Sequence, residues 1–458
     1  MLTLEKIFQS HNGARWVLLD FLVGFIAMLV ALTVTPYIDV YEVYNQFVVA
    51  AGYGAALVLC VRLCGLYAHR MQHLFSSYDV VLGAIQGSLF AYISIGLIVN
   101  FTHVHVFGRY VGGAVLLISF IGISVSRLLA KWYLSRHPMR IVLLGCNKLT
   151  REFGTRIADD PHFKIVCIAC VNSCDDPAIE EQFGFQKIDD VSLFTKYLNE
   201  ADTEIVVSCY DHSIPSEMYE LIELLPFCHI DLLNKGAFSE IFFREVSVSY
   251  RNLHWQSSSF FKPARGAVTS LKRLIDIAIS LPALLVTLPL WLPAMALIKL
   301  DSAGGAFYSQ TRVGLLGQPF KIFKFRTMTT DAEKNGAQWA TKKDARMTRI
   351  GALLRKTRLD ELPQLWNVLK GDMSLVGPRP ERPEFVEMLK NEIPLYEWRH
   401  LVKPGLTGWA QILFKYGDTV ADARRKLQYD LFYIKNFTLI LDIQILMRTI
   451  PVVMKGSQ

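Results

Sequence analysis

The feature that most constrains this chain is an apolar run of 22 residues without a charge, Ile277–Ile298. It is long enough to cross a bilayer as a helix. Pro282, Pro289 and Pro293 interrupt it, and Lys and Arg residues flank it on both sides. Basic flanks favour the cytoplasmic side of a membrane. We therefore predict a helix, broken near Pro289, that enters and leaves by the same face. A fifth complete span is the alternative.

Four more apolar segments precede this run, at about residues 16–38, 46–66, 79–101 and 108–128. The first connection carries acidic residues and no Lys or Arg, the second carries Arg70, and several basic residues follow the fourth segment from Arg127 onward. This pattern puts the N-terminus, the second connection and everything after Arg127 in the cytoplasm. The hydrophobic fraction of 52% and the mean hydropathy of +0.29 also exceed those of ordinary soluble proteins.

The net charge of +7 does not indicate a nucleic acid partner. In a membrane protein, positive charge first reflects topology and anionic lipid, and the sequence has no zinc finger or basic tract. Cys167, Cys170 and Cys174 lie in or just after a strand-like run and lack a matching group of His residues. They are therefore predicted to be buried reduced thiols rather than metal ligands.

Residues 136–255 alternate short apolar strands with helical stretches, which predicts a Rossmann-like α/β domain. The expected strands are Arg140–Gly145, Lys164–Asn172, Glu204–Ser208 and His229–Leu233, and the expected helices lie at 148–158 and around 215–224. In the turn after the first strand, Asn147 and Thr150 stand where a dinucleotide fingerprint needs glycine. A scaffolding or dimerisation role is therefore favoured over nucleotide sensing.

The most informative stretch is Lys356–Pro380. The adjacent carboxylates Asp360 and Glu361 follow a basic cluster, and a helix starting there would carry Pro363 in its first turn and end at Gly371. Such a helix would place Asp360, Gln364 and Asn367 on one face. A rigid basic turn, Gly377–Pro380, follows.

Carboxylates and cations crowded at one helix end suit a metal ion and a phosphate. The alternative is a solvated helix start whose acidic residues complement the helix dipole.

Cations also occur in two flanking segments. Lys321, Lys324 and Arg326 alternate with apolar residues in a short strand, which suits phosphate binding or, alternatively, protection of a sheet edge. Residues 329–345 form a polar loop suited to a lid, and Lys403 lies in a second rigid turn. The apolar tail at 437–453 carries charges and is predicted to lie against the membrane interface or the catalytic core.

Five segments together resemble the bacterial sugar transferase family of monotopic phosphoglycosyl transferases. They are LKRLID (271–276), KFRTM (324–328), RLDELPQLWNVLKGDMSLVGPRP (358–380), VKPGLTGWAQ (402–411) and YDLFYIKN (429–436). The resemblance covers about residues 268–458. The apolar segments and the middle domain are similar to long-form members, such as the undecaprenyl-phosphate glucose phosphotransferases of exopolysaccharide synthesis.

The resemblance implies that Asp360 is the nucleophile and that Glu361 holds Mg²⁺. It places six cations around the phosphates and the nucleotide: Lys324, Arg326, Arg355, Arg358, Arg379 and Lys403. The break in the membrane helix, often Ser-Pro in the family, is here Leu288-Pro289, so Thr287 is expected to replace the hydrogen bond of that serine.

The implied reaction moves a hexose 1-phosphate, by default glucose 1-phosphate, from a UDP-sugar to undecaprenyl phosphate through an aspartyl intermediate, with release of UMP. Galactose or an N-acetylhexosamine is the alternative sugar. Two other classes stay open: a non-catalytic membrane scaffold and a glycosyltransferase that releases UDP.

The predicted architecture has three parts. Residues 1–135 form a membrane bundle of four spans, 136–255 the Rossmann-like domain, and 256–458 a mainly α monotopic catalytic domain with a re-entrant helix at about 271–299. The predicted location is the bacterial inner membrane, in contact with its lipid and with both large domains on the cytoplasmic side. The surfaces are large enough for a homodimer.

Overall fold

A computed structural model describes most of the chain in two compact units, Met1–Arg244 and Glu245–Gln458. The described residues are 14–33, 43–64, 66, 77–101, 109–170, 177–188, 190–210, 218–228, 230–248, 266–330, 332, 346–414 and 419–454. Most of them are helical, as predicted, and a parallel sheet lies in the first unit.

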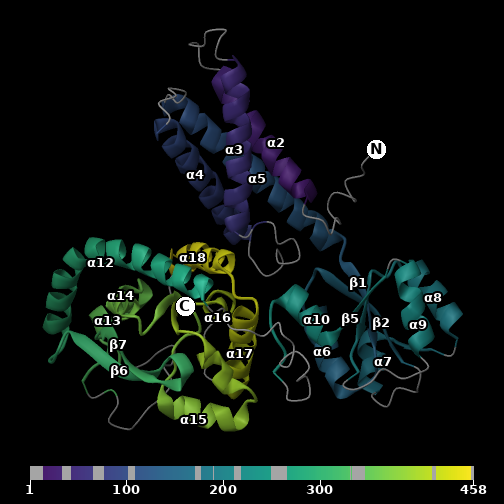
Figure 1. The fold of residues 1–458 in the computed structure, drawn as a ribbon. Coiled ribbons are helices and arrows are strands. Elements are labelled where there is room, and N and C mark those ends of the chain that lie inside the picture. Colours follow the sequence, from purple (N-terminus) through teal and green to yellow (C-terminus); the bar gives the residue numbers. More distant parts are fainter. Residues whose placement is uncertain are drawn as a thin grey trace. The chain divides into compact units, whose positions relative to one another are not determined.

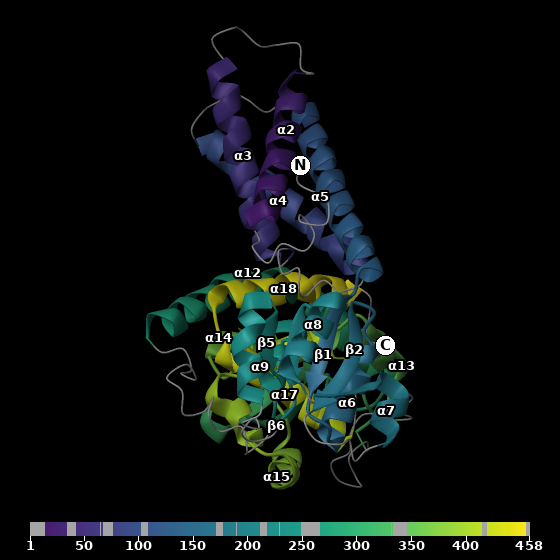
Figure 2. The same cartoon turned by 90° about the vertical axis from the view of Figure 1, so that its right-hand side faces the viewer.

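All four N-terminal apolar segments form helices (Figures 1 and 2). The helices are α2 (Ala14–Thr33), α3 (Val43–Leu63), α4 (Ser77–Phe101) and α5 (Arg109–Arg136). By length and composition, α4 and α5 are long and apolar enough to cross a membrane, whereas the apolar stretches of α2 and α3 are shorter. The helices are thus confirmed, and the membrane-crossing length is met by two of them.

Glycine allows α2 and α3 to approach closely. A Cβ atom on Gly24 would lie 3.0 Å from the Cα atom of Gly54, and one on Gly54 would lie 2.9 Å from the carbonyl oxygen of Phe21. Small residues at such contacts are how apolar helices pack against one another in lipid. Larger side chains at either position would force the helices apart.

A buried ion pair joins the first and last of these helices. Arg127 of α5 donates to the Asp20 carboxylate of α2, both side chains are fully buried, and the guanidinium lies 4.6 Å from the centre of the Trp16 ring. In the sequence Arg127 indicated only topology, and nothing singled out Asp20. Loss of one partner would leave an uncompensated buried charge, so the pair fixes how α2 and α5 pack.

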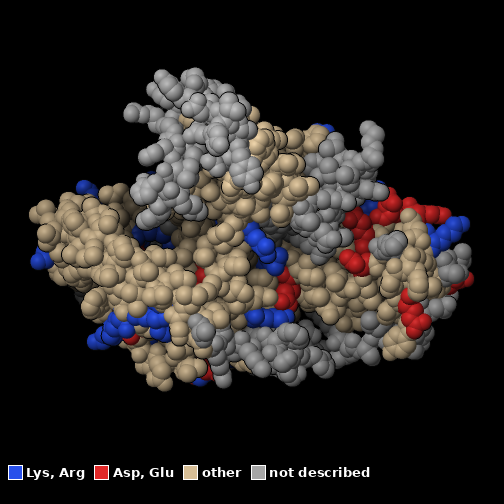
Figure 3. All heavy atoms as spheres, turned by 45° about the horizontal axis from the view of Figure 1, so that its top comes forward, with Lys and Arg blue, Asp and Glu red and all other residues tan. Residues whose placement is uncertain are grey.

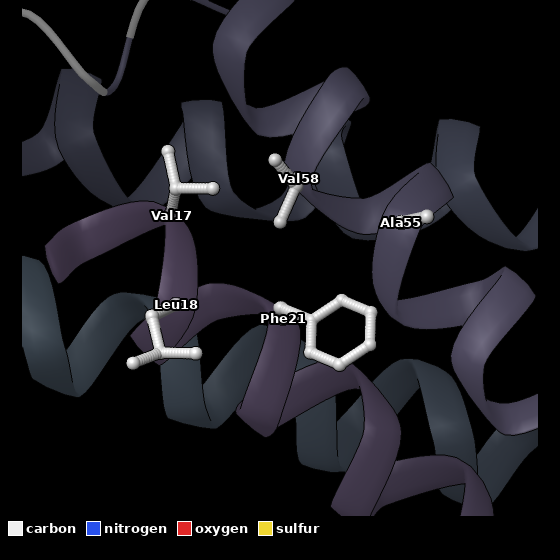
Figure 4. Close-up of a pocket in the computed structure, with 5 residues that line it drawn as sticks. All are labelled: Val17, Leu18, Phe21, Ala55 and Val58. Carbon is white, nitrogen blue, oxygen red and sulfur yellow. The ribbon is translucent and has the colours of Figure 1, made fainter. Parts of the chain in front are cut away.

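An apolar pocket of about 450 Å³ lies on the bundle, between α2 and α3 (Figure 4). Its lining side chains are Val17, Leu18, Phe21, Ala55 and Val58. These side chains offer no polar or titratable group, so the pocket is not a candidate for catalysis.

Five parallel strands form the sheet, in the order β3-β2-β1-β4-β5. The strands are β1 (Met139–Leu144), β2 (Phe163–Cys170), β3 (Phe185–Lys187), β4 (Ile205–Ser208) and β5 (Asp231–Asn234). The main helices around them are α6 (Lys148–Ala158), α7 (Pro177–Phe183), α8 (Val191–Glu200), α9 (Tyr219–Leu224) and α10 (Lys235–Phe238). The predicted parallel α/β arrangement is confirmed; β3 was not predicted.

Both faces of the sheet are buried, because alternate residues of each strand point to opposite sides. Ile141 and Leu143 of β1 pack into one apolar cluster with α6 and α10, and Val142 and Leu144 pack into another with α8 and α9. Figure 1 shows these helix pairs on opposite faces. Coverage on both sides explains why the strands read as continuous apolar runs.

The turn after β1 is closed by its own side chains. Gly145 has φ +109°, and the side-chain oxygen of Asn147 accepts hydrogen bonds from the Thr150 backbone N–H (2.8 Å) and hydroxyl (3.1 Å). Asn147 thus caps α6 and occupies a donor that a bound phosphate would otherwise use. This geometry agrees with the weak dinucleotide fingerprint.

Cys167 and Cys170 are buried and form no disulfide, as predicted. Cys174 lies outside the described residues, and Cys146 is disulfide-bonded.

The second unit is mainly helical, with two small sheets. A long helix α12 (Ala267–Asp301) leads into the antiparallel pair β6 (Phe307–Val313) and β7 (Pro319–Phe325). Next come α13 (Arg349–Lys356), the 3₁₀ turn η8 (Leu359–Glu361), α14 (Gln364–Lys370) and β8 (Ser374–Val376). The remaining elements are α15 (Pro383–Glu392), η9 (Tyr396–Leu401), β9 (Gly405–Thr407), α16 (Trp409–Leu413), α17 (Val420–Lys435) and α18 (Leu439–Met454).

Helix α12 is the third helix in the described part of the chain that is long and apolar enough to cross a membrane. Only 6% of its apolar stretch Val268–Asp301 is buried, and Figure 3 shows uncharged atoms over most of the surface around it. Exposed apolar area of this extent marks contact with a membrane or a partner.

Helix α12 bends (Figure 1), but the helix continues through all three prolines. Leu288 and Pro289 therefore lie inside a bent helix rather than at a non-helical break. The Thr287 hydroxyl donates to the carbonyls of Ala283 (2.8 Å) and Leu284 (3.2 Å). A proline and a threonine that bonds back to the preceding turn both bend helices.

Both ends of α12 are anchored to the same compact unit. Near its start, the Asp276 carboxylate accepts hydrogen bonds from the Ser374 hydroxyl and the Leu375 N–H, each 3.0 Å. At its end, Asp301 accepts from the Ile350 N–H (2.9 Å), and Ile298 lies in an apolar cluster with Phe325 and Leu354. A straight helix of 35 residues would be about 50 Å long, so the bend is what allows both ends to reach one body.

The C-terminal tail packs on this unit, as one of the two predicted options. Asp442 of α18 lies 2.6 Å from the Lys272 ammonium and accepts from the Tyr433 hydroxyl at 2.7 Å. Most of the expected lid, residues 329–345, lies outside the described residues.

Candidate active site

Asp360 and Glu361 lie on a tight turn, not on the α-helix predicted to start at Asp360. Leu359–Glu361 is a single 3₁₀ turn, and α14 begins only at Gln364, with Pro363 before it. Arg358 enters the turn with φ +55°, in the left-handed region. The predicted start of the helix was wrong because a 3₁₀ turn, Leu359–Glu361, precedes the α-helix, which has a different pitch. The predicted end at Gly371, with φ +99°, is confirmed.

The Asn367 side chain holds α14 against β7. Its oxygen accepts from the Phe323 N–H (3.0 Å) and its amide donates to the Lys321 carbonyl (2.7 Å). Fully buried by these contacts, Asn367 sets the position of the neighbouring Lys324 relative to η8. Its role is therefore structural, although the sequence pattern grouped it with Asp360. Trp366 of the same helix is exposed.

Three cations surround the buried carboxylate of Glu361. Its Oε1 atom lies 2.5 Å from Arg379 Nη2 and 3.1 Å from Lys324 Nζ, and its Oε2 atom lies 3.8 Å from Arg358 Nη1. Although burial alone would raise the pKa of Glu361, Arg379 and Lys324 hold it far below its ordinary value. These cations therefore favour the ionised form of Glu361.

Asp360 lies next to Glu361 and is equally buried, but its carboxylate is much less engaged. Among the described residues, no side chain or backbone group is recorded as donating a hydrogen bond to it. Burial, and then repulsion from Glu361, raise the pKa of Asp360 to about 6, while Lys324, Arg355 and Arg379 oppose the rise. Two adjacent carboxylates whose pKa values are pushed in opposite directions indicate two different roles.

Lys324 and Arg355 complete the cationic wall. Burial lowers the pKa of Lys324, and the Glu361 carboxylate opposes this effect. The Arg355 Nε atom donates to the Thr327 hydroxyl at 3.0 Å. Four of the six predicted cations, Lys324, Arg355, Arg358 and Arg379, thus lie around the carboxylate pair.

The other two cations have different surroundings. The buried guanidinium of Arg326 donates to the carbonyls of Ser302 (2.7 Å) and Ala303, just beyond the end of α12. The ammonium of Lys403 lies near Gly371, and its pKa is lowered by burial and by Arg273. These contacts give Arg326 a structural task and place Lys403 beside α12 and α14.

The described residues contain no group of three His, Cys, Asp or Glu side chains that could form a metal cage. Two adjacent carboxylates are the donor set of a different kind of site, in which Mg²⁺ takes one or two carboxylates and completes its shell with substrate phosphates and water. Asp360 and Glu361 fit that kind of site.

The residues that hold the loop around Arg379, above all Arg399 and Asp430, were not predicted from the sequence. Arg399 Nη2 donates to the Arg379 carbonyl and to Asp430 Oδ2, each at 2.9 Å. A usable signal was present, because Asp430 lies among apolar residues within the YDLFYIKN segment. A buried carboxylate there needs a cationic partner.

The profile of the bacterial sugar transferase family matches residues 267–456, which contain this whole site. A UDP-glucose:undecaprenyl-phosphate glucose-1-phosphate transferase of Xanthomonas campestris is 31% identical over 437 residues, covering 89% of this chain and 88% of the relative. The chain belongs to the bacterial sugar transferase family. The family and the enzyme class, phosphoglycosyl transferase, are thereby confirmed.

Two further relatives match shorter stretches. A UDP-N-acetylgalactosamine-undecaprenyl-phosphate N-acetylgalactosaminephosphotransferase of Aeromonas hydrophila is 39% identical over 252 residues, which are 55% of this chain and 59% of the relative. The UDP-glucose:undecaprenyl-phosphate glucose-1-phosphate transferase of Escherichia coli is 40% identical over 190 residues, 41% of each chain.

Proposed function

We propose that this chain transfers a hexose 1-phosphate from a UDP-sugar to undecaprenyl phosphate and releases UMP. The transferred sugar is proposed to be glucose. The step would be the first membrane reaction in making an exopolysaccharide, a capsule or an O-antigen. The observation that supports it best is the asymmetry of the carboxylate pair: Glu361 is surrounded by cations, whereas Asp360 is buried beside them and weakly engaged.

This asymmetry suits a displacement at phosphorus in two steps. An oxygen of ionised Asp360 attacks the β-phosphorus of the donor, and the bond to the bridging oxygen breaks with UMP leaving. A phosphate oxygen of undecaprenyl phosphate then attacks the same phosphorus, and the Asp360 carboxylate leaves. The product is a sugar diphospholipid. Lys324, Arg355 and Arg379 reduce the repulsion between anionic donor and carboxylate in both steps.

We propose Mg²⁺ as the cofactor, with Glu361 as its protein ligand and the donor diphosphate supplying further oxygens. When bound, the ion would neutralise charge on the diphosphate. In the free protein Lys324 and Arg379 balance the charge of Glu361, so donor binding would have to redirect these cations toward phosphate.

Glucose is proposed because the relative matched over most of the chain is named for it. An N-acetylhexosamine is a second candidate, because the Aeromonas relative is named for N-acetylgalactosamine. Galactose 1-phosphate remains a further alternative. Assaying purified protein with UDP-glucose, UDP-galactose and both UDP-N-acetylhexosamines separates these options.

We further propose that α12 is re-entrant in the bacterial inner membrane and that both large domains are cytoplasmic. The support is that Asp276 and Asp301, at opposite ends of α12, are bonded to one compact unit. The four N-terminal helices would span the membrane. The parallel sheet would be a Rossmann-like scaffold, available for homodimer formation, since Asn147 closes its first turn.

A single-turnover experiment tests the reaction. Protein in detergent is incubated with UDP-glucose labelled in the sugar and without lipid acceptor, and both the nucleotide and the protein are analysed. We expect one equivalent of UMP and a labelled phosphosugar on Asp360 by mass spectrometry. Release of UDP would support a glycosyltransferase, and no release of either nucleotide, even with lipid, would support a scaffold.

Topology is tested by cysteine labelling in intact cells. In Ala340→Cys, within the predicted polar loop, the new thiol should not react with a membrane-impermeant maleimide until the inner membrane is opened. Labelling in intact cells would support a fifth complete span.

A further inference from the structure

Arg379 reaches Glu361 from a segment without helix or strand, residues 377–382 between β8 and α15. If the backbone of this segment were mobile, the Arg379 guanidinium could move by more than the length of a hydrogen bond. The backbone of this segment is instead held by two other arginines. Arg399 Nη2 donates to the Arg379 carbonyl at 2.9 Å, and Arg312 Nη1 donates to the Pro380 carbonyl at 3.1 Å.

Arg399 is itself fixed on every side that the structure records. Its Nη1 atom donates to the Tyr396 hydroxyl at 2.6 Å, and its Nη2 atom lies 2.9 Å from Asp430 Oδ2. The exposed fractions of the two charged side chains are 6% and 3%. Because the guanidinium is planar and its donors form a rigid fork, fixing it at Asp430 and Tyr396 fixes where it meets Arg379.

Glu381 links the two arginines. Its Oε1 atom lies 3.9 Å from Arg399 and its Oε2 atom 3.7 Å from Arg312, while its backbone oxygen accepts from the Val313 N–H at 2.9 Å. The segment is thus bound at residues 379 to 381 by these groups, and at its start the Gly377 N–H donates to the Thr407 carbonyl and the Pro378 carbonyl accepts from the Gly405 N–H, each at 2.9 Å. Of its charged supports, Arg399 and Asp430 are buried and Arg312 and Glu381 are partly buried. Buried ion pairs are a poor source of stability compared with apolar packing. What they supply here is a fixed position.

We propose that Arg399, oriented by Asp430 and Tyr396, is a positioning residue for the donor half of the reaction. It holds the Arg379 backbone so that the Arg379 guanidinium meets Glu361 in the free protein and the donor diphosphate in the complex. Arg399 acts through Arg379 and touches no reacting atom. The inference rests on the proposed function for its kinetic consequences, but the support of segment 377–382 stands on the contacts alone.

The kinetic test compares two buried carboxylates that each pair with an arginine in this unit. Asp430→Asn weakens the support of Arg399, whereas Glu245→Gln weakens an ion pair with Arg425, 3.7 Å away. We expect kcat/KM for the UDP-sugar to fall about tenfold in Asp430→Asn and about 100-fold in Arg399→Met, as for a misplacement on the order of 1 Å. Arg399→Lys should recover part of the loss, and Glu245→Gln should stay within about twofold. KM for undecaprenyl phosphate should not change.

A double-mutant cycle distinguishes positioning from general stability. If Arg399 acts through Arg379, the double variant Arg379→Ala/Arg399→Met should be no slower than Arg379→Ala alone. Additive losses would overturn the proposal. Should Arg399→Met fail to fold, Arg399→Lys and Asp430→Asn enter the same cycle with Arg379→Ala.

Hydrogen exchange provides a readout that does not depend on activity. The amides of Gly377, Arg379, Glu381 and Arg382 should exchange faster in Asp430→Asn than in wild type, and Glu245→Gln should leave them unchanged. Equal exchange in all three proteins would overturn the positioning role. If wild type releases no UMP but exchange changes as expected, the proposed reaction fails while the support of the segment stands.

Discussion

Two sharp turns among the described residues have a backbone conformation that could suit a phosphate site. Of the two, the turn after α13 also has charged groups that could bind a phosphate. The turn after β1 passes through Gly145 in a left-handed conformation, and the turn after α13 does the same at Arg358. In the first, Asn147 accepts from both Thr150 donors, so the turn is complete without a ligand. In the second, Asp360 and Glu361 are buried together with cations that a bound diphosphate could share.

The two turns differ in the free energy needed to bury their polar groups. A neutral side-chain cap satisfies the first turn at the ordinary strength of a hydrogen bond. Two adjacent buried carboxylates repel each other, and only the surrounding Lys and Arg side chains make them tolerable. Titratable groups held in such an unfavourable state are candidates for a functional site. The fold around them does not by itself indicate a function.

The largest expected effect comes from removing the proposed nucleophile. Asp360→Asn keeps the shape of the side chain but not its charge, so the labelled adduct and UMP release should both fall by more than about 10³-fold. Added Mg²⁺ should not restore them. A stoichiometric adduct on another residue would show that Asp360 is not the nucleophile.

A smaller effect is expected when the anchoring carboxylate is neutralised. In Glu361→Gln the three cations lose their common partner, and activity should fall by about 100-fold. If Glu361 also binds the metal, raising Mg²⁺ should recover part of the activity by mass action. Glu387→Gln, at an exposed pair with Lys390, is the matched control and should be neutral. No response to Mg²⁺ would leave Glu361 an anchor for cations only.

The pH dependence should report the raised pKa of Asp360, which is about 6. Only the ionised carboxylate attacks phosphorus, so adduct formation is weak below that value and complete above it. Between pH 5 and pH 7 the single-turnover rate should rise about tenfold. Replacing Lys324 by Met removes a cation that lowers this pKa and should move the rise to higher pH. A rate that is flat across this range would contradict the assignment.

The smallest effect is expected at the first turn. Asn147→Ala removes the cap of α6 and should lower the free energy of unfolding by about 1 kcal/mol, measured by denaturant titration. UMP release should not change, and NAD should bind neither protein. Binding of NAD to wild type would show that the first turn is also a ligand site and would remove the contrast.

Much of this protein was determined by the sequence alone. The long apolar segments gave the helices, the alternating strands gave the parallel sheet, and the ordered motifs around Asp360 and Arg379 gave the family. These features are local: they depend on periodicity, on turn residues and on the order of side chains along the chain.

Tertiary structure decided which charged residues meet. Asp20 and Arg127 are 107 positions apart, and Arg399 and Asp430 are 31 apart, yet both pairs are buried. Arg326 and Lys324 are only two positions apart in the sequence, but the tertiary structure gives them different partners. Arg326 bonds the backbone at the end of α12, whereas Lys324 bonds Glu361. Sequence spacing could not reveal these pairs, because a long charged side chain can point in many directions. Once it is buried, only the directions in which its charge meets a partner are favourable.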